Sequence, residues 1–362
     1  MGLTAAPARA DAPGPLDPSA RMLRGDDASE SYGIYVELES GHRIAQQFLL
    51  TNAGPGEHSA VALGHLVEPG RAPFRYENGR REGRWTLSDD RLYFDIAASH
   101  LDLHRPEGEL RITKDVIEIF VHFDFAPGDF DARVPAAHLP PDYHVDLLAV
   151  GAPARARLRA PWMEKDLVTE GRVWLHHTWT KREESELLAR RIDVVGHANG
   201  TSFYGLFLDG EKSLSQAWVA SRVACDGMIE SRINVPDRWR DSEGVRAGQP
   251  ESEYPLPTGL EFSRGGETGR ITLGREWLRF DPLSVIPQPF RWFIRRTSKP
   301  RQVWADATIG GTLFAAPETP SLPNAGEAES GCTSKRETET ETAERSVTGV
   351  ASITFLNPFD RR

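Results

Sequence analysis

Apolar and polar residues alternate along much of the chain, most clearly between Ile117 and Phe125. Every second residue of this segment is apolar, whereas Glu118, His122 and Asp124 lie between the apolar positions. A period of two is typical of a β-strand, whose side chains point alternately to two faces. A carboxylate beside an imidazole could serve catalysis, but an antiparallel strand with one face in water has the same pattern. We therefore interpret the polar face as solvated.

Similar short segments recur along the chain, separated by Gly, Pro, Asp and Ser. The first two, on either side of Ser40-Gly41, have the pattern of a β-hairpin. The predicted strands lie within residues 32–51, 58–66, 74–77, 84–96, 101–112, 116–125, 142–159, 171–180, 201–208, 215–224, 227–235, 259–263, 270–280, 289–294, 302–314 and 346–356. Residues 182–192 fit either a helical turn or a strand. Because almost no segment has a helical period, the sequence predicts an all-β protein.

The chain has 362 residues, more than one hydrophobic core usually serves. We expect a disordered N-terminal tail at 1–29, a first β-barrel at 30–160 and a second at 161–362. Barrels remove exposed strand edges and can hold one small ligand, although a pair of β-sandwiches would also fit the strand pattern. Residues 315–345 are polar and of low complexity, which predicts a disordered insertion. The strand predicted at 346–356 should then return to close a sheet.

Composition and charge exclude several classes of function. The net charge of −10 argues against a nucleic-acid partner, because phosphate binding needs a basic surface. Two cysteines, Cys225 and Cys332, do not make a disulfide framework. No apolar run approaches the roughly 20 residues of a membrane helix, and no signal-peptide core of about 7 to 15 residues is present. We expect a cytoplasmic protein whose contact with membrane lipid is transient at most.

The segment at residues 171–180 gathers the most distinctive side chains. It contains Trp174, His176, His177 and Trp179, and alternation puts the last two on one face and the first two on the other. Neighbouring histidines on opposite faces cannot chelate one metal ion. No Gly-rich phosphate loop, CxxC pair or HExxH motif occurs, so neither a cofactor nor a metal is expected. One face of this strand should line a cavity for an apolar molecule.

Several segments resemble one known group of proteins. Residues 35–52 and 85–92 resemble the first domain of the fungal survival-factor family. Residues 171–179, with Arg190-Arg191 and residues 204–210 after them, are similar to the Asp-His-Asn-Trp region of bacterial AttH proteins and carotenoid 1,2-hydratases. These belong to one tandem lipocalin-like (calycin) group, which also includes fungal Diels-Alderases. The resemblance implies two consecutive lipocalin-like antiparallel β-barrels and an apolar ligand.

The resemblance also bears on chemistry, because the group contains lipid carriers, stress-survival factors and cofactor-free enzymes. In the hydratases a His-x-Trp is followed by a Tyr-x-Asp that contributes acid chemistry. His177 and Trp179 match the first pair and Tyr204 matches the tyrosine, but Leu206 stands where the aspartate is expected. Protonating an alkene needs a strong, positioned acid, and His177 would have to act alone. This departure favours ligand carriage over hydration.

Two hypotheses remain from the sequence. The first is a binding protein for a hydrophobic, lipid-like or isoprenoid ligand, linked to stress survival, with Trp174, His177, Trp179 and Tyr204 as ligand contacts. The alternative is a cofactor-free lyase or cyclase acting on an isoprenoid or polyketide, with His177 and Tyr204 as catalytic residues. The same residues could also form a packed aromatic core in which His177 hydrogen-bonds Tyr204.

Overall fold

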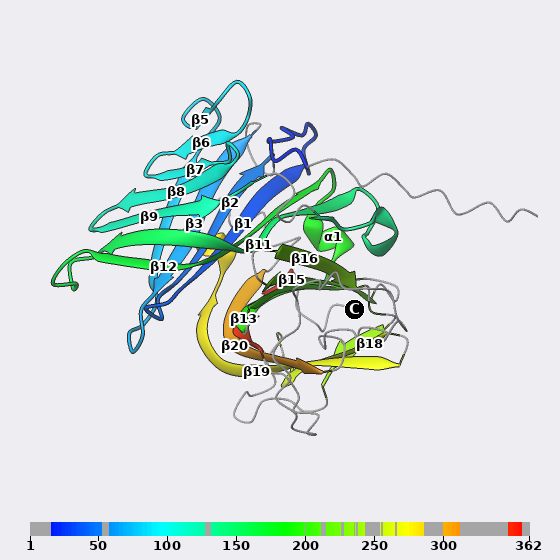
Figure 1. Cartoon of the computed structure of the whole chain (residues 1–362). Coiled ribbons are helices and arrows are strands. Elements are labelled where there is room, and N and C mark those ends of the chain that lie inside the picture. The colour runs from blue at the N-terminus through cyan, green and yellow to red at the C-terminus, as the bar shows by residue number, and fades with distance from the viewer. Residues whose placement is uncertain are drawn as a thin grey trace, which may run out of the picture.

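The protein consists of two antiparallel β-sheets that curl into barrels and pack against each other (Figure 1). The computed structural model describes residues 16–52, 58–126, 132–198, 200–210, 215–225, 228–234, 236, 238–242, 254, 256–264, 266–285, 300–311 and 347–356. The predicted all-β class is confirmed, since only three short helical segments occur among these residues. They are η1 (Ala136–His138), α1 (Glu184–Leu187) and η2 (Pro282–Val285). None of the helices in these ranges is long and apolar enough to cross a membrane.

The first sheet contains 12 of the described strands and lies at the upper left of Figure 1. Its strand order is β4 (Phe74–Arg80), β3 (Ser59–Val67), β2 (Arg43–Thr51), β1 (Ser29–Leu38), β12 (Leu167–Thr180), β11 (Tyr143–Arg159), β9 (Ile117–Asp124), β8 (Glu107–Lys114), β7 (Ser99–Asp102), β6 (Tyr93–Ile96) and β5 (Thr86–Leu87). The short strand β10 (Ala132–Arg133) pairs with β11. The hairpin predicted around Ser40-Gly41 is confirmed, because β1 and β2 pair and Gly41 adopts a positive φ of 80° in the turn.

The second sheet contains nine described strands, at the lower right of Figure 1. Its order is β16 (Met228–Asn234), β15 (Ser215–Cys225), β14 (Thr201–Asp209), β13 (Arg190–Ala198), β21 (Val347–Phe355), β20 (Arg301–Gly311), β19 (Glu267–Phe280), β18 (Gly259–Arg264) and β17 (Arg238–Asp241). Strand β21 lies between β13 and β20, so the prediction that the last strand returns to close a sheet is confirmed. The insertion predicted at residues 315–345 lies outside the described residues.

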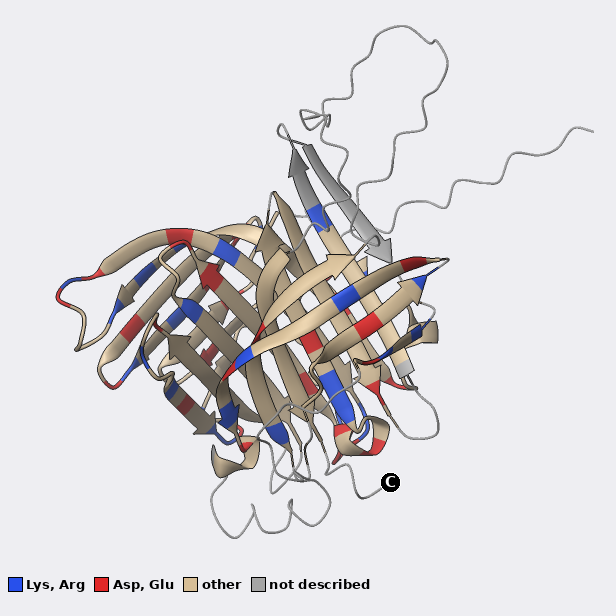
Figure 2. Cartoon of the chain, turned by 90° about the horizontal axis from the view of Figure 1, so that it is seen from below, with Lys and Arg blue, Asp and Glu red and all other residues tan. Residues whose placement is uncertain are grey.

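Each sheet curls until strands near its two ends approach each other. In the first sheet β4 contacts β6, and in the second β15 contacts β17. The result is one half-barrel and one nearly closed barrel, as the lipocalin-like prediction requires. Acidic and basic side chains are interspersed over the strands of both sheets (Figure 2). The polar face of β9 is at the surface, where His122 and Asp124 are exposed, so the solvated interpretation of this strand is confirmed.

The division between the two halves differs from the expected one. Strand β12 pairs with β11 of the first sheet along its whole length and with β1 from Gly171 to Thr180, and the second sheet begins with β13. The change of sheet therefore falls between Thr180 and Arg190 instead of at residue 161. At the N-terminus, residues 16–28 are described, with Ala20 almost fully buried, where we expected a tail up to residue 29.

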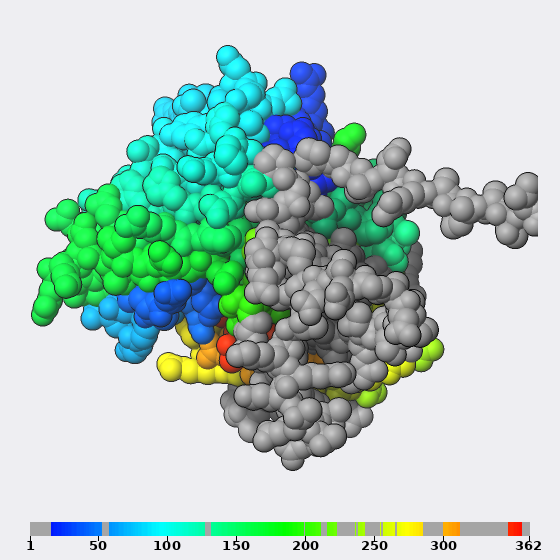
Figure 3. Space-filling view, in the orientation of Figure 1, coloured from blue at the N-terminus to red at the C-terminus, as the bar shows by residue number. Residues whose placement is uncertain are grey.

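Three hydrophobic cores follow from this arrangement. One fills the first barrel and one fills the second. The third lies between the two sheets and combines Trp174 of β12 and Leu147 of β11 with Tyr204, Leu206 and Trp218 of the second sheet. In Figure 3 the blue and green strands of the first sheet lie directly against the orange and red strands of the second. From Val173 onward strand β12 is therefore covered on both faces, by its own barrel on one side and by the second sheet on the other.

Candidate functional site

Strand β12 carries the two neighbouring histidines into different surroundings. His177 points into the first barrel, where its ring stacks on Tyr32 at 4.2 Å between centroids and 8° between planes. Its Nε2 lies 2.7 Å from Glu30 Oε1, and both side chains are almost fully buried. Tyr204 is not among its contacts in the described part of the chain. The predicted grouping of His177 with Tyr204 therefore does not occur.

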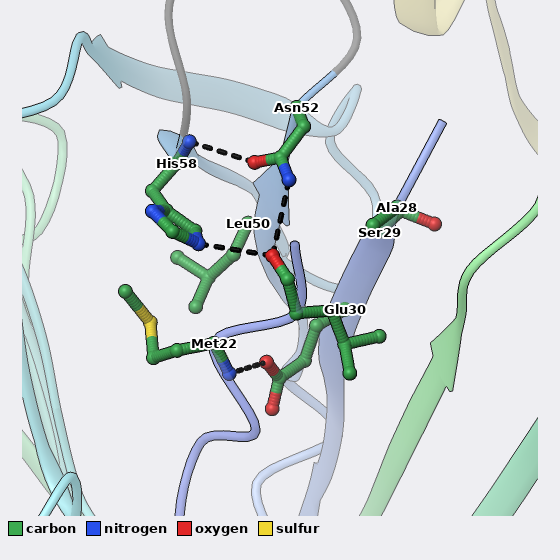
Figure 4. A pocket seen from close by; sticks show the side chains of 8 residues that line it. Met22, Ala28, Ser29, Glu30, Leu50, Asn52 and His58 are labelled. Atoms are coloured by element: carbon green, nitrogen blue, oxygen red, sulfur yellow. Dashed lines mark hydrogen bonds between the residues drawn. The ribbon is translucent and has the colours of Figure 1, made fainter. Parts of the chain in front are cut away.

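The hydrogen bonds of Glu30 indicate the role of the buried His177–Glu30 pair. Its carboxylate also accepts hydrogen bonds from the backbone N–H groups of Arg21 at 2.7 Å and Met22 at 3.0 Å. Glu30, Met22 and Leu50 line a cavity of about 10 Å³ (Figure 4), which is too small for an organic ligand. His177 and Glu30 thus fasten the N-terminal segment to the first barrel, which is a structural role.

Trp179 lies close to His177, as its spacing predicted, with 4.7 Å between ring centroids. Its ring also stacks on His144 at 5.0 Å, and the guanidinium of Arg21 lies 4.9 Å from the indole centroid. Contacts of an indole with an imidazole and a guanidinium contribute stacking and cation–π energy. Trp179 also borders the larger cavity described next, so it contributes to packing and to the cavity wall.

A cavity of about 350 Å³ lies between the two sheets. Its walls come from β1, β2, β3 and β12 of the first sheet and from β13, β14, β20 and β21 of the second. Tyr35, Leu63, Trp174, Trp304 and Val350 give it a mainly apolar lining, and the rings of Tyr35 and Trp304 stack at 6.0 Å. Small-molecule sites commonly have this size and make-up, with a few polar groups that fix orientation.

Several polar groups of this cavity form one connected cluster. Arg191 donates two hydrogen bonds to Asp193, at 2.8 and 2.9 Å, and the Tyr204 hydroxyl donates to the same carboxylate at 2.5 Å. Arg191 Nη1 also donates to the hydroxyls of Tyr143 at 2.9 Å and Thr178 at 3.0 Å. Arg191, Asp193 and Tyr204 all line the cavity. The cluster is thus a fully hydrogen-bonded ion pair in the cavity wall.

Burial and charge determine the protonation of these groups. Burial acts to raise the pKa of Asp193, but the neighbouring Arg191 outweighs it and holds that pKa below the usual value. Burial, reinforced by the Asp193 charge, raises the pKa of Tyr204 well above its ordinary value. Burial, reinforced by Arg191, lowers the pKa of His176 to about 3. At neutral pH the cavity wall therefore presents a neutral imidazole, a neutral phenol and an ionised, paired carboxylate.

His176 is one polar group of the cavity wall that a ligand can contact. Its ring lies 5.9 Å from that of Tyr204, and its nitrogens have no hydrogen-bond partner among the described residues. A neutral imidazole offers one donor and one acceptor. Gly33 pairs with His176 across β1 and β12, and a Cβ on Gly33 would come within 2.2 Å of the imidazole. The glycine therefore makes room for the ring beside the cavity.

The structure thus places three of the four predicted ligand residues, Trp174, Trp179 and Tyr204, in the wall of one cavity. It replaces His177 by His176 and adds Asp193, both of which the sequence reasoning left out. Asp193 is on β13, the strand paired with β14, which carries Tyr204. The signal available in the sequence was the Arg191-x-Asp193 spacing, which puts an opposite-charge pair on one strand face. Among the described residues no group of three or more His, Cys, Asp or Glu could hold a metal ion.

The sequence matches no family model and no curated protein. Solved structures do match it over nearly its whole length. A putative AttH protein from Nitrosomonas europaea is similar over 95% of this chain and 99% of its own, with a TM-score of 0.58 and 11% identity. Kievitone hydratase from Nectria haematococca covers 94% of both chains, with a TM-score of 0.55 and 8% identity. CghA, solved with Sch210972, covers 92% of this chain and 89% of its own, with a TM-score of 0.54 and 14% identity. The chain has the tandem lipocalin-like fold that the resemblance predicted.

Proposed function

We propose that the cavity between the two sheets binds one small apolar molecule that carries a polar group, and that His176 contacts this group. The observation that supports this most directly is an apolar cavity of about 350 Å³ with an unpartnered imidazole in its wall. The neutral imidazole offers one donor and one acceptor, so a ligand hydroxyl or carbonyl can hydrogen-bond to it in the cavity. A lipid-like or isoprenoid skeleton suits the remaining walls.

Retinol tests this proposal, because it has an apolar polyene body and one hydroxyl group. Its binding can be followed by its fluorescence and by native mass spectrometry. Val195→Trp would fill the cavity and should abolish binding, since Val195 lines it from β13. His176→Phe keeps the cavity apolar but removes one hydrogen bond, so we expect about tenfold weaker binding.

The matched control for His176→Phe is His177→Gln, which changes the neighbouring histidine on the other face of β12. It should leave retinol affinity unchanged in the folded fraction, because His177 does not line the cavity. Retinol binding that survives Val195→Trp in a folded variant would contradict the proposed site. Equal losses in the two histidine variants would contradict the role of His176.

A cofactor-free lyase or cyclase is the second candidate. It is supported by the Tyr204-Asp193-Arg191 cluster beside His176 and by the fold shared with a structure named as a hydratase. In this reading His176 accepts a proton as a neutral base, while the Tyr204 phenol orients a substrate oxygen. His177 is then a positioning residue of the first barrel and not a catalytic one. A cytoplasmic location and a link to stress survival stay predictions.

Incubating the protein with isoprenoid and polyketide alkenes, and testing for products, distinguishes an enzyme from a carrier. If the protein is an enzyme, His176→Gln should lower turnover by roughly a hundredfold or more and leave binding within a few fold, as is typical for loss of a general base. A carrier would return every bound compound unchanged. Product formed equally well by the His176→Gln variant would remove His176 from the mechanism.

A further inference from the structure

A second polar cluster lies at the other end of the interface between the sheets. Arg172 lies on the face of β12 that meets the second sheet, two residues before Trp174 and four before His176. On β13, His197 follows Val195 on the same face. Trp174 and Val195 both line the large cavity, whereas Arg172 and His197 do not. The two clusters are therefore separated by apolar side chains.

A bulge in β11 organises this cluster. The pairing of β11 with β12 shifts register between Val150 and Ala152, and Gly151 is the extra residue. Gly151 has a φ of 61°, and a Cβ there would lie 1.9 Å from Ser202 Oγ of the second sheet. Only glycine fits both the backbone conformation and the close approach. Its carbonyl is left outside the regular ladder.

Two guanidinium groups converge on that carbonyl. Arg172 Nη1 donates to Gly151 O at 3.1 Å, and Arg222 Nη1 of β15 donates to the same oxygen at 3.3 Å. Arg222 is only 5% exposed, and its Nε is buried without a hydrogen-bond partner. Neither arginine makes an ion pair within the described ranges. One neutral oxygen therefore accepts hydrogen bonds from two cations, and neither guanidinium has another hydrogen bond to a described residue.

His197 completes the cluster, with its Nδ1 2.9 Å from Ser202 Oγ. Burial, reinforced by Arg172 and Arg222, lowers the pKa of His197 to about 4. Burial and then Arg222 also lower the pKa of Arg172, and the opposing effect of Glu39 is smaller than either. These shifts reflect a local excess of positive charge, and in the described part of the chain no carboxylate is hydrogen-bonded to these three groups. By contrast, Arg191 at the other end of the interface is paired with Asp193.

We propose that Arg172, Arg222 and His197 form a binding site for a small oxyanion, such as a phosphate or carboxylate group. Buried cations require a counter-charge, and the fork of a guanidinium matches the geometry of these oxyanions. Arg172 and His197 are partly exposed, so an anion can reach the cluster from solvent. The site is distinct from the apolar cavity and does not depend on the function proposed for it.

Inorganic phosphate and hexyl phosphate, added to the full chain at constant ionic strength, test the site. Calorimetric titration should give saturable binding, and Arg172→Gln should weaken it at least tenfold. Because Arg222 is buried and its variants could fail to fold, His197→Gln provides the second variant and should also weaken binding. The matched control is Arg155→Gln, which removes an exposed arginine from β11, the strand of Gly151.

Tight binding of hexyl phosphate would identify the anionic group of a larger molecule as the ligand. Binding of inorganic phosphate alone would identify a free anion, and both results support the site. Retinol binding should be the same in Arg172→Gln as in the unaltered protein, which keeps this test separate from that of the cavity. Failure of both phosphates to bind, or an equal loss in Arg155→Gln, would overturn the proposal.

Discussion

His176 and His177 are joined by one peptide bond, yet they belong to different parts of the molecule. His177 is enclosed by the first barrel, stacked on Tyr32 and hydrogen-bonded to Glu30. His176 faces the second sheet, lines the large cavity and has no hydrogen-bond partner among the described residues. Residue type alone does not distinguish a structural histidine from a functional one. What distinguishes them is which sheet covers each face of β12.

The position of β12 in the first sheet explains why both faces matter. From Gly171 to Thr180 it pairs with β1 on one side and β11 on the other, so this part of its backbone is inside the sheet. Side chains on one face, such as Leu175, fill the first barrel, and those on the other, such as Trp174, fill the space between the sheets. A strand buried on both faces can therefore support the fold with every second residue and line a site with the rest.

The largest expected effect comes from removing the structural histidine. His177→Ala deletes a packed ring and leaves the buried Glu30 carboxylate without one of its donors, so we expect the free energy of unfolding to fall by about 3 kcal/mol. Urea denaturation measures this loss. His176→Ala is the matched control and should cost less than about 1 kcal/mol, because it removes a polar group that has no partner. Equal losses for the two variants would break the comparison.

Acidification should distinguish His176 by a smaller effect. Its folded pKa of about 3 lies below the ordinary value of 6.5, so the unfolded chain binds more protons between these values. Stability therefore falls as the pH drops through this window, and at pH 5 His176 should account for between about 1 and 2 kcal/mol of the loss. His176→Gln should flatten the curve of unfolding free energy against pH. His65, whose pKa burial also lowers to about 3, keeps some of the slope.

The control for the pH experiment is His104, whose shift has the opposite sign. Hydrogen bonds from its ring to Asp102 and Asp90 raise the pKa of His104, so its contribution is present at low pH and is lost as the pH rises. His104→Gln should therefore make the loss of stability on acidification steeper. An acid profile unchanged by His176→Gln would mean that the imidazole is not held neutral by burial.

The fold could be predicted from the sequence because its signals are local or repeated. Alternation identified the strands, Ser40-Gly41 identified the first hairpin, and the apolar run after residue 345 identified the closing strand. The alternation in β12 also separated His176 from His177 correctly. It could not say which face meets the second sheet, because that depends on pairing between β1 and β12, which are far apart in the sequence. Because the sequence did not show which face of β12 meets the second sheet, His177 was predicted as the ligand contact instead of His176.

The site was harder to predict because its carboxylate comes from a neighbouring strand. The resemblance pointed to residue 206, where this chain has a leucine, and the absence of an acid there argued against catalysis. Asp193 on β13 supplies the missing carboxylate to Tyr204 on β14. Only the register of those two strands brings the groups together. The arginine pair at Gly151 was hidden for the same reason, since its members lie on different strands.

The smallest effect is expected from removing the hydrogen bond between the Tyr204 hydroxyl and the Asp193–Arg191 ion pair. Tyr204→Phe removes the hydroxyl that donates to Asp193, but the carboxylate keeps both hydrogen bonds from Arg191. The loss in the free energy of unfolding should therefore be about 1 kcal/mol, well below that of His177→Ala. Tyr76→Phe is the matched control, because the Tyr76 hydroxyl is buried without a partner and its removal should be neutral or stabilising. A loss for Tyr204→Phe as large as that for His177→Ala would contradict this comparison. Asp193 would then depend on the Tyr204 hydroxyl and not on Arg191 alone. The cavity face of β12 and its neighbours would be as essential to the fold as the barrel face.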